Sequence, residues 1–234
     1  MEQQGPIRLL AVETSSSVAG AAVVVGGKLA AEEYLDHRLT HSEVILPMVD
    51  RVLGGACVST KEITALAVDV GPGSFTGGRI GVCLANGMAA ALEVPVVAVD
   101  ALEAMAWLFP AFSGVVCPLL DARKDQVYAA AFCCKNGEPV ELGERFAGSV
   151  GEFLPALRAY GEELLFVGDG AAAQKELLRA EFPKARFAPC HLDRPRASAV
   201  AAAALAKLER GETVREAMPL YLKKPQAERM KYGD

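Results

Sequence analysis

Short apolar runs and segments with helical spacing alternate along the first hundred residues. Short runs bounded by turn residues are typical of buried strands. Five strands are predicted, over residues 7–12, 18–25, 28–36, 63–70 and 94–100. Gly26-Gly27, between the second and third runs, is a hairpin signal. In residues 43–53 apolar side chains recur at intervals of three and four, which predicts an amphipathic helix ended by Gly54-Gly55.

A second helix is predicted within residues 71–92, after a glycine-rich loop. The order is then three strands, helix, strand, helix and strand. Alternation of this kind predicts an α/β fold, with a mixed sheet covered by helices. A hairpin-led sheet with crossover helices is the unit of the ribonuclease-H-like and actin-like (ASKHA) folds.

The second half of the chain opens in the same order. A strand at VVCPLLDAR is followed by a hairpin around Asn136-Gly137, a strand–turn–helix at ELLFVGDGAAAQKELL and a helix at ASAVAAAALAKLERG. We therefore predict a duplicated architecture with a divergent second copy. The expected domains are 1–108 and 109–234, with the tail 219–234 packed back on the first domain.

Composition narrows the class of protein. The 234 residues are 52% hydrophobic and 23% charged, with a net charge of −5. Such a chain is not expected to wrap nucleic acid alone, because that affinity depends on clustered Lys and Arg. No apolar run reaches the roughly 18 residues of a membrane span, and the first residues show no export signal. The six cysteines form no CxxC pair and most lie in apolar segments, so we expect reduced, buried thiols in a cytoplasmic protein.

The stretch GPGSFTGGRIGVCLANGMAAAL has the outline of a phosphate-binding loop before a helix. Gly73 and Gly78 stand at the spacing of the two Walker A glycines. The next two positions hold Arg79 and Ile80, where that motif needs Lys and then Ser or Thr. The loop therefore lacks the phosphate-binding charge and the Mg²⁺-binding hydroxyl, and we do not expect it to hold a nucleotide.

The same glycines indicate close packing. Gly77, Gly81 and Ala85 are four residues apart and share one helix face. A glycine inside a helix costs about 1 kcal/mol relative to alanine, so their repetition predicts that something packs tightly against the backbone. The two alternatives are the chain's own helix at 43–53 and the helices of a partner.

Three polar turns are candidates for facing a nucleotide, as the corresponding turns do in actin-like proteins. They are Glu13-Thr14-Ser15-Ser16, Asp121-Ala122-Arg123 and Gly168-Asp169-Gly170. In each case the alternative is an ordinary structural turn. If they act together, the chain would be a nucleotide-dependent actin-like ATPase or phosphotransferase.

Metal and nucleophile chemistry receive little support. His37, His41 and His191 form no HxxxH or HExxH pair, so no zinc site is expected. No Ser–His–Asp set can be assembled from spacing. We predict no catalytic residue, no metal ligand and no cofactor.

Four motifs in order, LLAVETSSS, HSEVILPMVDRVL, ITALAVDVGPGSFTGGRIGVCLANGMA and LLDARKDQVYAAAF, resemble the TsaB family of the glycoprotease-like superfamily. The likeness covers about the first 135 residues well and the remainder loosely, and PLYLKKP at 219–225 resembles the family's usual ending. Older descriptions call this superfamily peptidases.

The resemblance implies an actin-like fold and an accessory subunit that dimerises with TsaD, the catalytic subunit of tRNA threonylcarbamoyladenosine synthesis. It also implies the ATPase TsaE as a partner, tRNA contact only through the complex, and a homodimer when the chain is alone. TsaD holds its metal partly through an HxxxH pair. Ala101 and Met105 stand at the matching positions here, which implies a catalytically inert pseudoenzyme.

The resemblance also places the partner interface on the two N-terminal helices. The expected interface positions are Ile45, Met48, Val49, Val52, Gly77, Gly81, Leu84, Ala85 and Met88.

Overall fold

The computed structural model describes residues 5–36 and 40–222, and the chain divides into two compact units. Of the described residues, unit 1 contains 5–36, 40–104 and the returning segment Pro195–Pro219, while unit 2 contains Met105–Arg194 and 220–222. Most of the tail 219–234, predicted to pack on the first domain, lies outside the described residues. The predicted boundary after residue 108 lies close to the observed one. The assignment of residues 195–219 to the C-terminal domain is wrong, because their helix packs on the first sheet.

Unit 1 is built on a five-stranded sheet with the order β3-β2-β1-β4-β5. Its strands are β1 (Arg8–Glu13), β2 (Val18–Val25), β3 (Lys28–Asp36), β4 (Ala65–Asp69) and β5 (Val96–Val99). The first three are antiparallel neighbours, and β4 and β5 run parallel to β1. Both β1 and β4 are almost wholly buried, which fits their continuous apolar sequences. All five predicted strands are confirmed.

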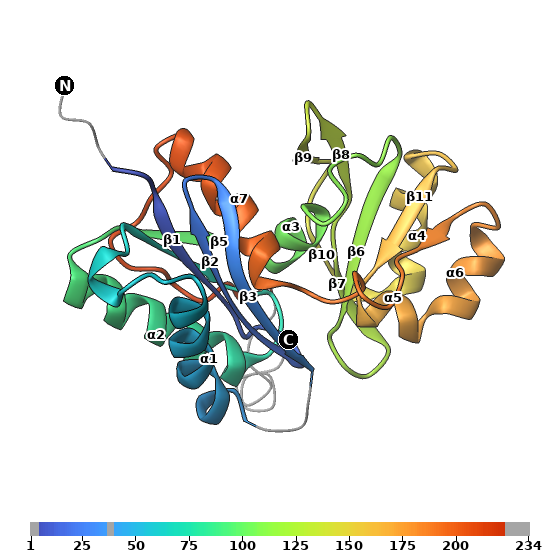
Figure 1. Ribbon diagram of the computed structural model, residues 1–234. Coiled ribbons are helices and arrows are strands. Elements are labelled where there is room, and N and C mark those ends of the chain that lie inside the picture. The colour runs from blue at the N-terminus through green and yellow to red at the C-terminus, as the bar shows by residue number, and fades with distance from the viewer. Residues whose placement is uncertain (1–4, 37–39, 223–234) are drawn as a thin grey trace. The chain divides into compact units, whose positions relative to one another are not determined.

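Helices cover both faces of this sheet (Figure 1). Helices α1 (His41–Gly55) and α2 (Phe75–Leu92) lie on one face, and α7 (Ala197–Glu209) lies on the other. A short helix, α3 (Ala101–Ala106), follows β5, and a 3₁₀ turn, Thr60–Glu62, precedes β4. Pro47 is the seventh residue of α1, beyond the first turn where a missing N–H costs little, so the helix lacks one hydrogen bond to the Glu43 carbonyl oxygen.

Unit 2 contains a second sheet whose main path is β10-β7-β6-β11-β12. Its strands are β6 (Val115–Asp121), β7 (Gln126–Ala129), β8 (Phe132–Lys135), β9 (Glu138–Glu141), β10 (Phe146–Ser149), β11 (Leu164–Val167) and β12 (Arg186–Phe187). The predicted turn at Asn136-Gly137 is confirmed: both residues have positive φ and they join β8 to β9. Strands β7 and β8 pair with different parts of β6, so the predicted single hairpin is in fact two pairings.

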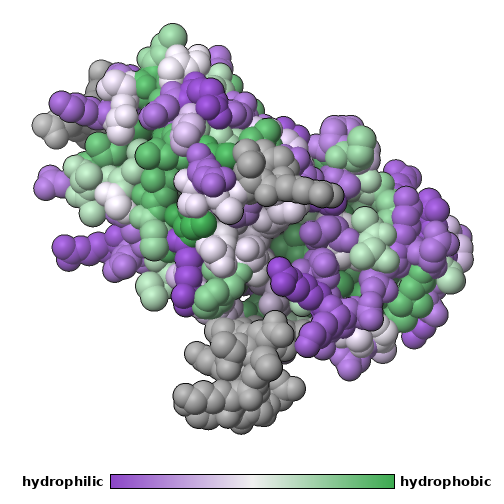
Figure 2. Space-filling model, turned by 90° about the horizontal axis from the view of Figure 1, so that it is seen from below, coloured by the Kyte–Doolittle hydropathy of each residue, from purple (hydrophilic) through white to green (hydrophobic). Residues whose placement is uncertain are grey.

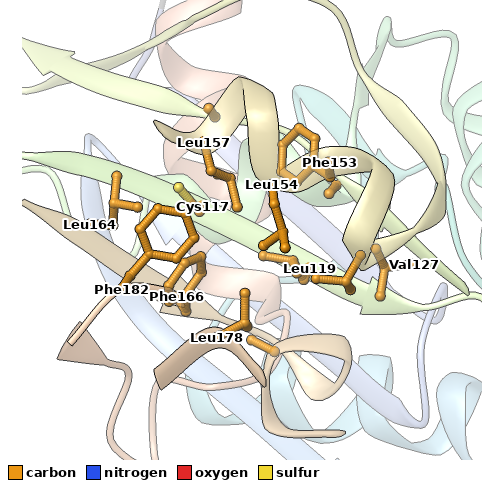
Figure 3. Close-up of a cluster of buried hydrophobic side chains, with 14 of the residues drawn as sticks. Cys117, Leu119, Val127, Phe153, Leu154, Leu157, Leu164, Phe166, Leu178 and Phe182 are labelled. Atoms are coloured by element: carbon orange, nitrogen blue, oxygen red, sulfur yellow. The ribbon is translucent and has the colours of Figure 1, made fainter. Parts of the chain in front are cut away.

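The core of unit 2 lies between this sheet and its helices α4 (Val150–Ala159), α5 (Asp169–Ala173) and α6 (Lys175–Glu181). Figure 3 shows Phe153, Leu154 and Leu157 of α4 pointing toward the strands, with Phe166 of β11 and Leu178 of α6 in the same cluster. From β6 and β11 the cluster takes every second residue, because successive residues of a strand face opposite sides of the sheet.

Both sheets follow the same plan. In each, an antiparallel hairpin precedes a strand that runs parallel to the first strand of the unit, so β1, β2 and β4 correspond to β6, β7 and β11. This repetition confirms the predicted duplicated actin-like α/β fold.

Candidate functional site

Two buried carboxyl groups meet where β1 and β4 end. The strands are parallel neighbours, with Val12 paired to Val68, so the next residues, Glu13 and Asp69, lie side by side. Both are 0% exposed and their side chains are hydrogen-bonded to each other. The Ser15 hydroxyl lies 2.8 Å from Asp69 Oδ2 and 3.1 Å from Glu13 Oε1, so it bridges the pair.

Burial sets the protonation of this pair. Desolvation raises the pKa of Glu13, and it raises the pKa of Asp69 well above its ordinary value, with the charge of Glu13 adding to the effect. Two carboxyl groups can hydrogen-bond to each other only when one carries a proton. The Ser15 N–H donates to Glu13 Oε1 (2.8 Å), which favours the ionised form of Glu13. Asp69 carries the proton, because burial and the charge of Glu13 raise its pKa well above the ordinary value even though the Gly71 N–H donates to it.

The glycine-rich loop closes over the turn that follows β1. The Ser74 N–H donates to the Ser15 carbonyl oxygen (2.5 Å), and a Cβ at Gly73 would overlap that same oxygen. The Gly71 N–H donates to Asp69 Oδ1 (2.7 Å). The loop thus packs on the chain's own backbone, where a Walker loop would instead surround a phosphate.

Gly77 and Gly81 of α2 likewise allow close packing on the chain's own backbone and side chains. A Cβ at Gly77 would overlap the Thr14 carbonyl oxygen and lie 2.6 Å from the His41 ring, and a Cβ at Gly81 would overlap the Thr14 hydroxyl. His41 is itself fixed, because its Nε2–H donates to the Ser16 carbonyl oxygen (2.8 Å). The predicted tight packing is confirmed, but the predicted helical neighbour is not: Gly77 and Gly81 pack mainly on the end of β1 and the turn after it, and only His41 comes from α1.

The three predicted nucleotide-facing turns fall in different units. Glu13, Thr14 and Ser15 are fully buried in unit 1, with the polar contacts described above. In unit 2, Asp169 Oδ1 accepts from the N–H groups of Asp121 (2.8 Å) and Gly170 (2.9 Å), so these two turns are joined.

The glycines at 168 and 170 are explained by packing on β6. Gly168 has a φ of 110°, and a Cβ there would overlap the Leu119 carbonyl oxygen. A Cβ at Gly170 would lie 2.9 Å from the same oxygen.

A small pocket adjoins Gly168. Its volume is about 80 Å³, below the roughly 300 to 1,000 Å³ typical of small-molecule sites. It is lined by Phe166, Val167, Gly168, Ala171, Ala172, Lys175, Phe187, Ala188 and Asp193. As it stands, the pocket has room for a few atoms and not for a nucleoside.

Among residues 5–36 and 40–222, no three His, Cys, Asp or Glu residues are grouped so that they could hold a metal ion. His37 lies outside the described residues. Ala101 and Met105, at the positions that the resemblance matches to metal-binding histidines, are fully buried. The prediction of buried cysteines is wrong for Cys57, Cys83 and Cys190, which are exposed.

The nine predicted interface positions divide by burial. Seven of them are buried in unit 1, and only Leu84 and Met88 are half-buried. The buried ones are Ile45, Met48, Val49, Val52, Gly77, Gly81 and Ala85. They face the sheet because the most apolar side of an amphipathic helix is the one that enters the core of its own domain. The partner interface itself stays a prediction, and it can use only the outer sides of these helices.

Those outer sides carry several apolar side chains among polar ones. Leu46 on α1 is 53% exposed, and Phe75 on α2 is also exposed. The apolar or small α2 residues that are exposed or half-buried and face away from the sheet are Ile80, Cys83, Leu84, Gly87, Met88, Ala90 and Ala91. Thr76 and Arg79 are exposed beside them, and the Arg79 guanidinium lies over the Phe75 ring. Figure 2, which views the molecule from below, shows hydrophobic residues gathered on this side of unit 1. We call the apolar or small set, with Leu46 and Phe75, the outer helix face.

Sequence reasoning missed Asp69. The available signal was its position: it ends a buried strand predicted to run parallel to β1, which itself ends in Glu13. It also missed Asn86, whose contact lies 131 residues away and leaves no local pattern.

Comparison with known proteins identifies first the superfamily and then the family of the chain. The family described as "TsaD: tRNA N6-adenosine threonylcarbamoyltransferase" matches residues 36–231, so the duplicated fold is that of the TsaD superfamily. Within it, the Bacillus subtilis (strain 168) "tRNA threonylcarbamoyladenosine biosynthesis protein TsaB" is 31% identical over 170 residues, 73% of this chain and 74% of that relative. The chain belongs to the TsaB family.

Solved structures share the fold of this chain. A crystal structure of an uncharacterized protein with similarity to peptidase YEAZ from Pseudomonas aeruginosa superposes with a TM-score of 0.81 at 28% identity, covering 93% of this chain and all of that one. The activator of the 2-hydroxyisocaproyl-CoA dehydratase from Clostridium difficile, with bound ADPNP, gives 0.50 at 10% identity, covering 88% of this chain and 98% of that one. The second likeness shows the fold alone.

In the part of the chain that the structure describes, none of the helices is long and apolar enough to cross a membrane.

Proposed function

We propose that the chain is an accessory subunit for threonylcarbamoyladenosine modification of tRNA, and that it docks on a TsaD-family subunit through the outer helix face. The observation that carries this proposal is the exposed apolar surface of α1 and α2 on a chain of the TsaB family. Exposed apolar patches of this kind mark interaction sites, because burying them against a partner removes apolar area from water.

The chain supports the partner's chemistry and performs none itself. Its deepest polar groups, Glu13 and Asp69, are fully buried and bonded to each other and to the neighbouring turns. Ala101 and Met105 offer no ligand for a hard or borderline cation. These features support a subunit that keeps an enzyme's fold and presents a surface.

The remaining partners follow from the same role. TsaE would join through the complex, and tRNA would be contacted only there, in the cytoplasm where tRNA is modified. In the absence of TsaD the same apolar face would pair two copies of the chain in a homodimer.

The test uses charges placed on the outer helix face. Leu46→Glu and Met88→Glu should each weaken binding to the TsaD counterpart by about ten-fold or more, because a charge would be buried without a partner. Complex formation is measured by light scattering and titration calorimetry, and tRNA modification is assayed with the full system. Leu177→Glu on α6 of unit 2, where the leucine is 39% exposed, is the matched control.

Full affinity in both helix variants would contradict the proposed surface. The assignment of a supporting role fails separately if the isolated chain turns over ATP with Mg²⁺ or modifies tRNA without TsaD.

A further inference from the structure

The segment after α7 is fastened to unit 1 at two points. Val214 forms an antiparallel bridge with Val96 of β5: the Val96 N–H donates to the Val214 carbonyl oxygen at 3.1 Å, and the Val214 N–H donates back at 2.8 Å. Three residues later, Asn86 of α2 holds the backbone of Ala217 with both ends of its amide. We call residues 213–218 the strap.

Asn86 makes a two-point contact that a purely packing residue would not make. Its Nδ2 donates to the Ala217 carbonyl oxygen and its Oδ1 accepts from the Ala217 N–H, both at 2.9 Å. Asparagine is a poor residue for the middle of a helix. Covering the edge of β5 would account for the Val214 bridge, but it does not account for a second attachment to α2.

The strap runs on the side of α2 opposite to α1. At 100° per residue, Ala85 faces the sheet, so Leu84 and Asn86 project to opposite sides of the helix. The Leu84 side is the α1 side, because Gly77, seven residues earlier on the same face, contacts His41 at the start of α1. The outer positions of α2, among them Cys83 and Gly87, therefore lie between α1 and the strap.

The strap ends in an exposed apolar side chain at this position. Ala217 is 1% exposed, and Met218 directly after it is 70% exposed, the highest value for a large hydrophobic side chain in the described residues. A flexible thioether side chain held by a fixed neighbour suits an adaptable contact. A backbone held at two points beside a strongly exposed apolar side chain indicates that this segment is part of a binding surface.

We propose that the strap is the second edge of the partner surface, that Met218 contacts the TsaD-family subunit docked on the outer helix face, and that Asn86 is the residue that positions it. This inference rests on the proposed function and extends its site. The occupant is that subunit because Asn86 anchors the strap to α2, the helix that carries most of the outer helix face, so one partner that covers α2 also reaches the strap.

The experiment is a double-mutant cycle on the full chain with the TsaD counterpart, read by titration calorimetry. Met218→Glu should weaken binding about ten-fold, and Met218→Leu should leave it unchanged. Asn86→Ala favours the helix but frees the strap, and should weaken binding about five-fold while amide exchange at Val214 and Ala217 speeds up. If Asn86 acts by placing Met218, the double variant should bind no more weakly than Met218→Glu alone.

Comparing Met88→Glu with Met218→Glu separates the possible failures, with Leu177→Glu as the control that should not change binding. If Met88→Glu weakens binding while Met218→Glu does not, the strap is outside the interface and this inference is overturned, although the proposed function stands. If neither changes affinity, the proposed surface itself is wrong. Fully additive losses for Asn86 and Met218 would overturn the positioning role. Weakened self-association with unchanged TsaD binding would assign the strap to a second copy of this chain instead.

Discussion

Asp69 and Glu13 are two carboxyl groups that the fold of unit 1 closes off from solvent. Each strand delivers one carboxyl to the same sheet edge, and the glycine-rich loop then closes over both. One shared proton and the N–H groups of Ser15 and Gly71 take the place of a cation. The pair therefore fixes two turns and the start of α2 from inside the core.

This arrangement predicts a stability that falls with rising pH. The pKa of Asp69 is raised in the folded chain, so the folded state keeps a proton that the unfolded chain releases near pH 4. The free energy of unfolding should then decrease as pH rises from about 4 to the folded pKa, by at most about 1.4 kcal/mol per pH unit. Urea unfolding of the wild type and of Asp69→Asn across pH 5 to 9 measures it.

Asp69→Asn should flatten this dependence, since an amide can still donate to Glu13 and carries no titrating proton. Asp50→Asn, on the exposed side of α1, is the control and should keep the wild-type slope. Equal slopes in all three proteins would mean that the buried pair does not hold the proton.

At the scale of elements, α2 has two faces of small residues, and the sequence alone cannot tell which one meets the sheet. Gly77, Gly81 and Ala85 follow one stripe, while Gly87 and Ala91 follow another. Periodicity reports that a face is apolar or small, whereas burial depends on the strand that the tertiary fold places beneath it. This is why the strand and helix order could be predicted but the exposed side of α2 could not.

The two stripes of α2 respond to substitution in opposite directions. Gly81→Ala should lower the free energy of unfolding by about 1 to 3 kcal/mol, because its Cβ would overlap the Thr14 hydroxyl. Gly87→Ala has open space around the new Cβ and should raise it by about 0.4 to 1 kcal/mol. Urea unfolding of the two variants provides the comparison, and a shared sign would show that the stripes are not distinguished by packing.

Helices α7 and α4 show what local sequence patterns can and cannot predict. Helix α7 is recognisable from its alanine-rich sequence, but alanine on every side gives no direction, so its return to the first sheet was not predictable. Helix α4 is not among the predicted elements, although its sequence carries a helical signal. Val150, Phe153, Leu154 and Leu157 recur at helical spacing, after a capping box of Ser149 with Glu152.

At the scale of the whole molecule, unit 1 is complete only when the C-terminal part of the chain returns to it. Residues up to Ala104 supply the sheet with α1 and α2, and Pro195–Pro219 supplies α7 and the strap. The sheet core and the Met218 side of the outer helix face thus depend on both parts. A partner that binds this unit should therefore stabilise the folded state as a whole.

Thermal unfolding of the chain with each candidate ligand distinguishes the subunit from the enzyme. Saturation with the TsaD counterpart at about 100 times its Kd should add about 2.7 kcal/mol and raise the Tm of this chain by roughly 5 to 10 °C. ATP with Mg²⁺ should leave the Tm unchanged, because Glu13, Thr14 and Ser15 are closed within unit 1 and the pocket beside Gly168 is about 80 Å³. Met88→Glu should remove the first effect, since it acts on the surface that the partner covers. A Tm that rises with ATP alone and ignores TsaD would instead favour an actin-like ATPase, with the outer helix face serving another purpose.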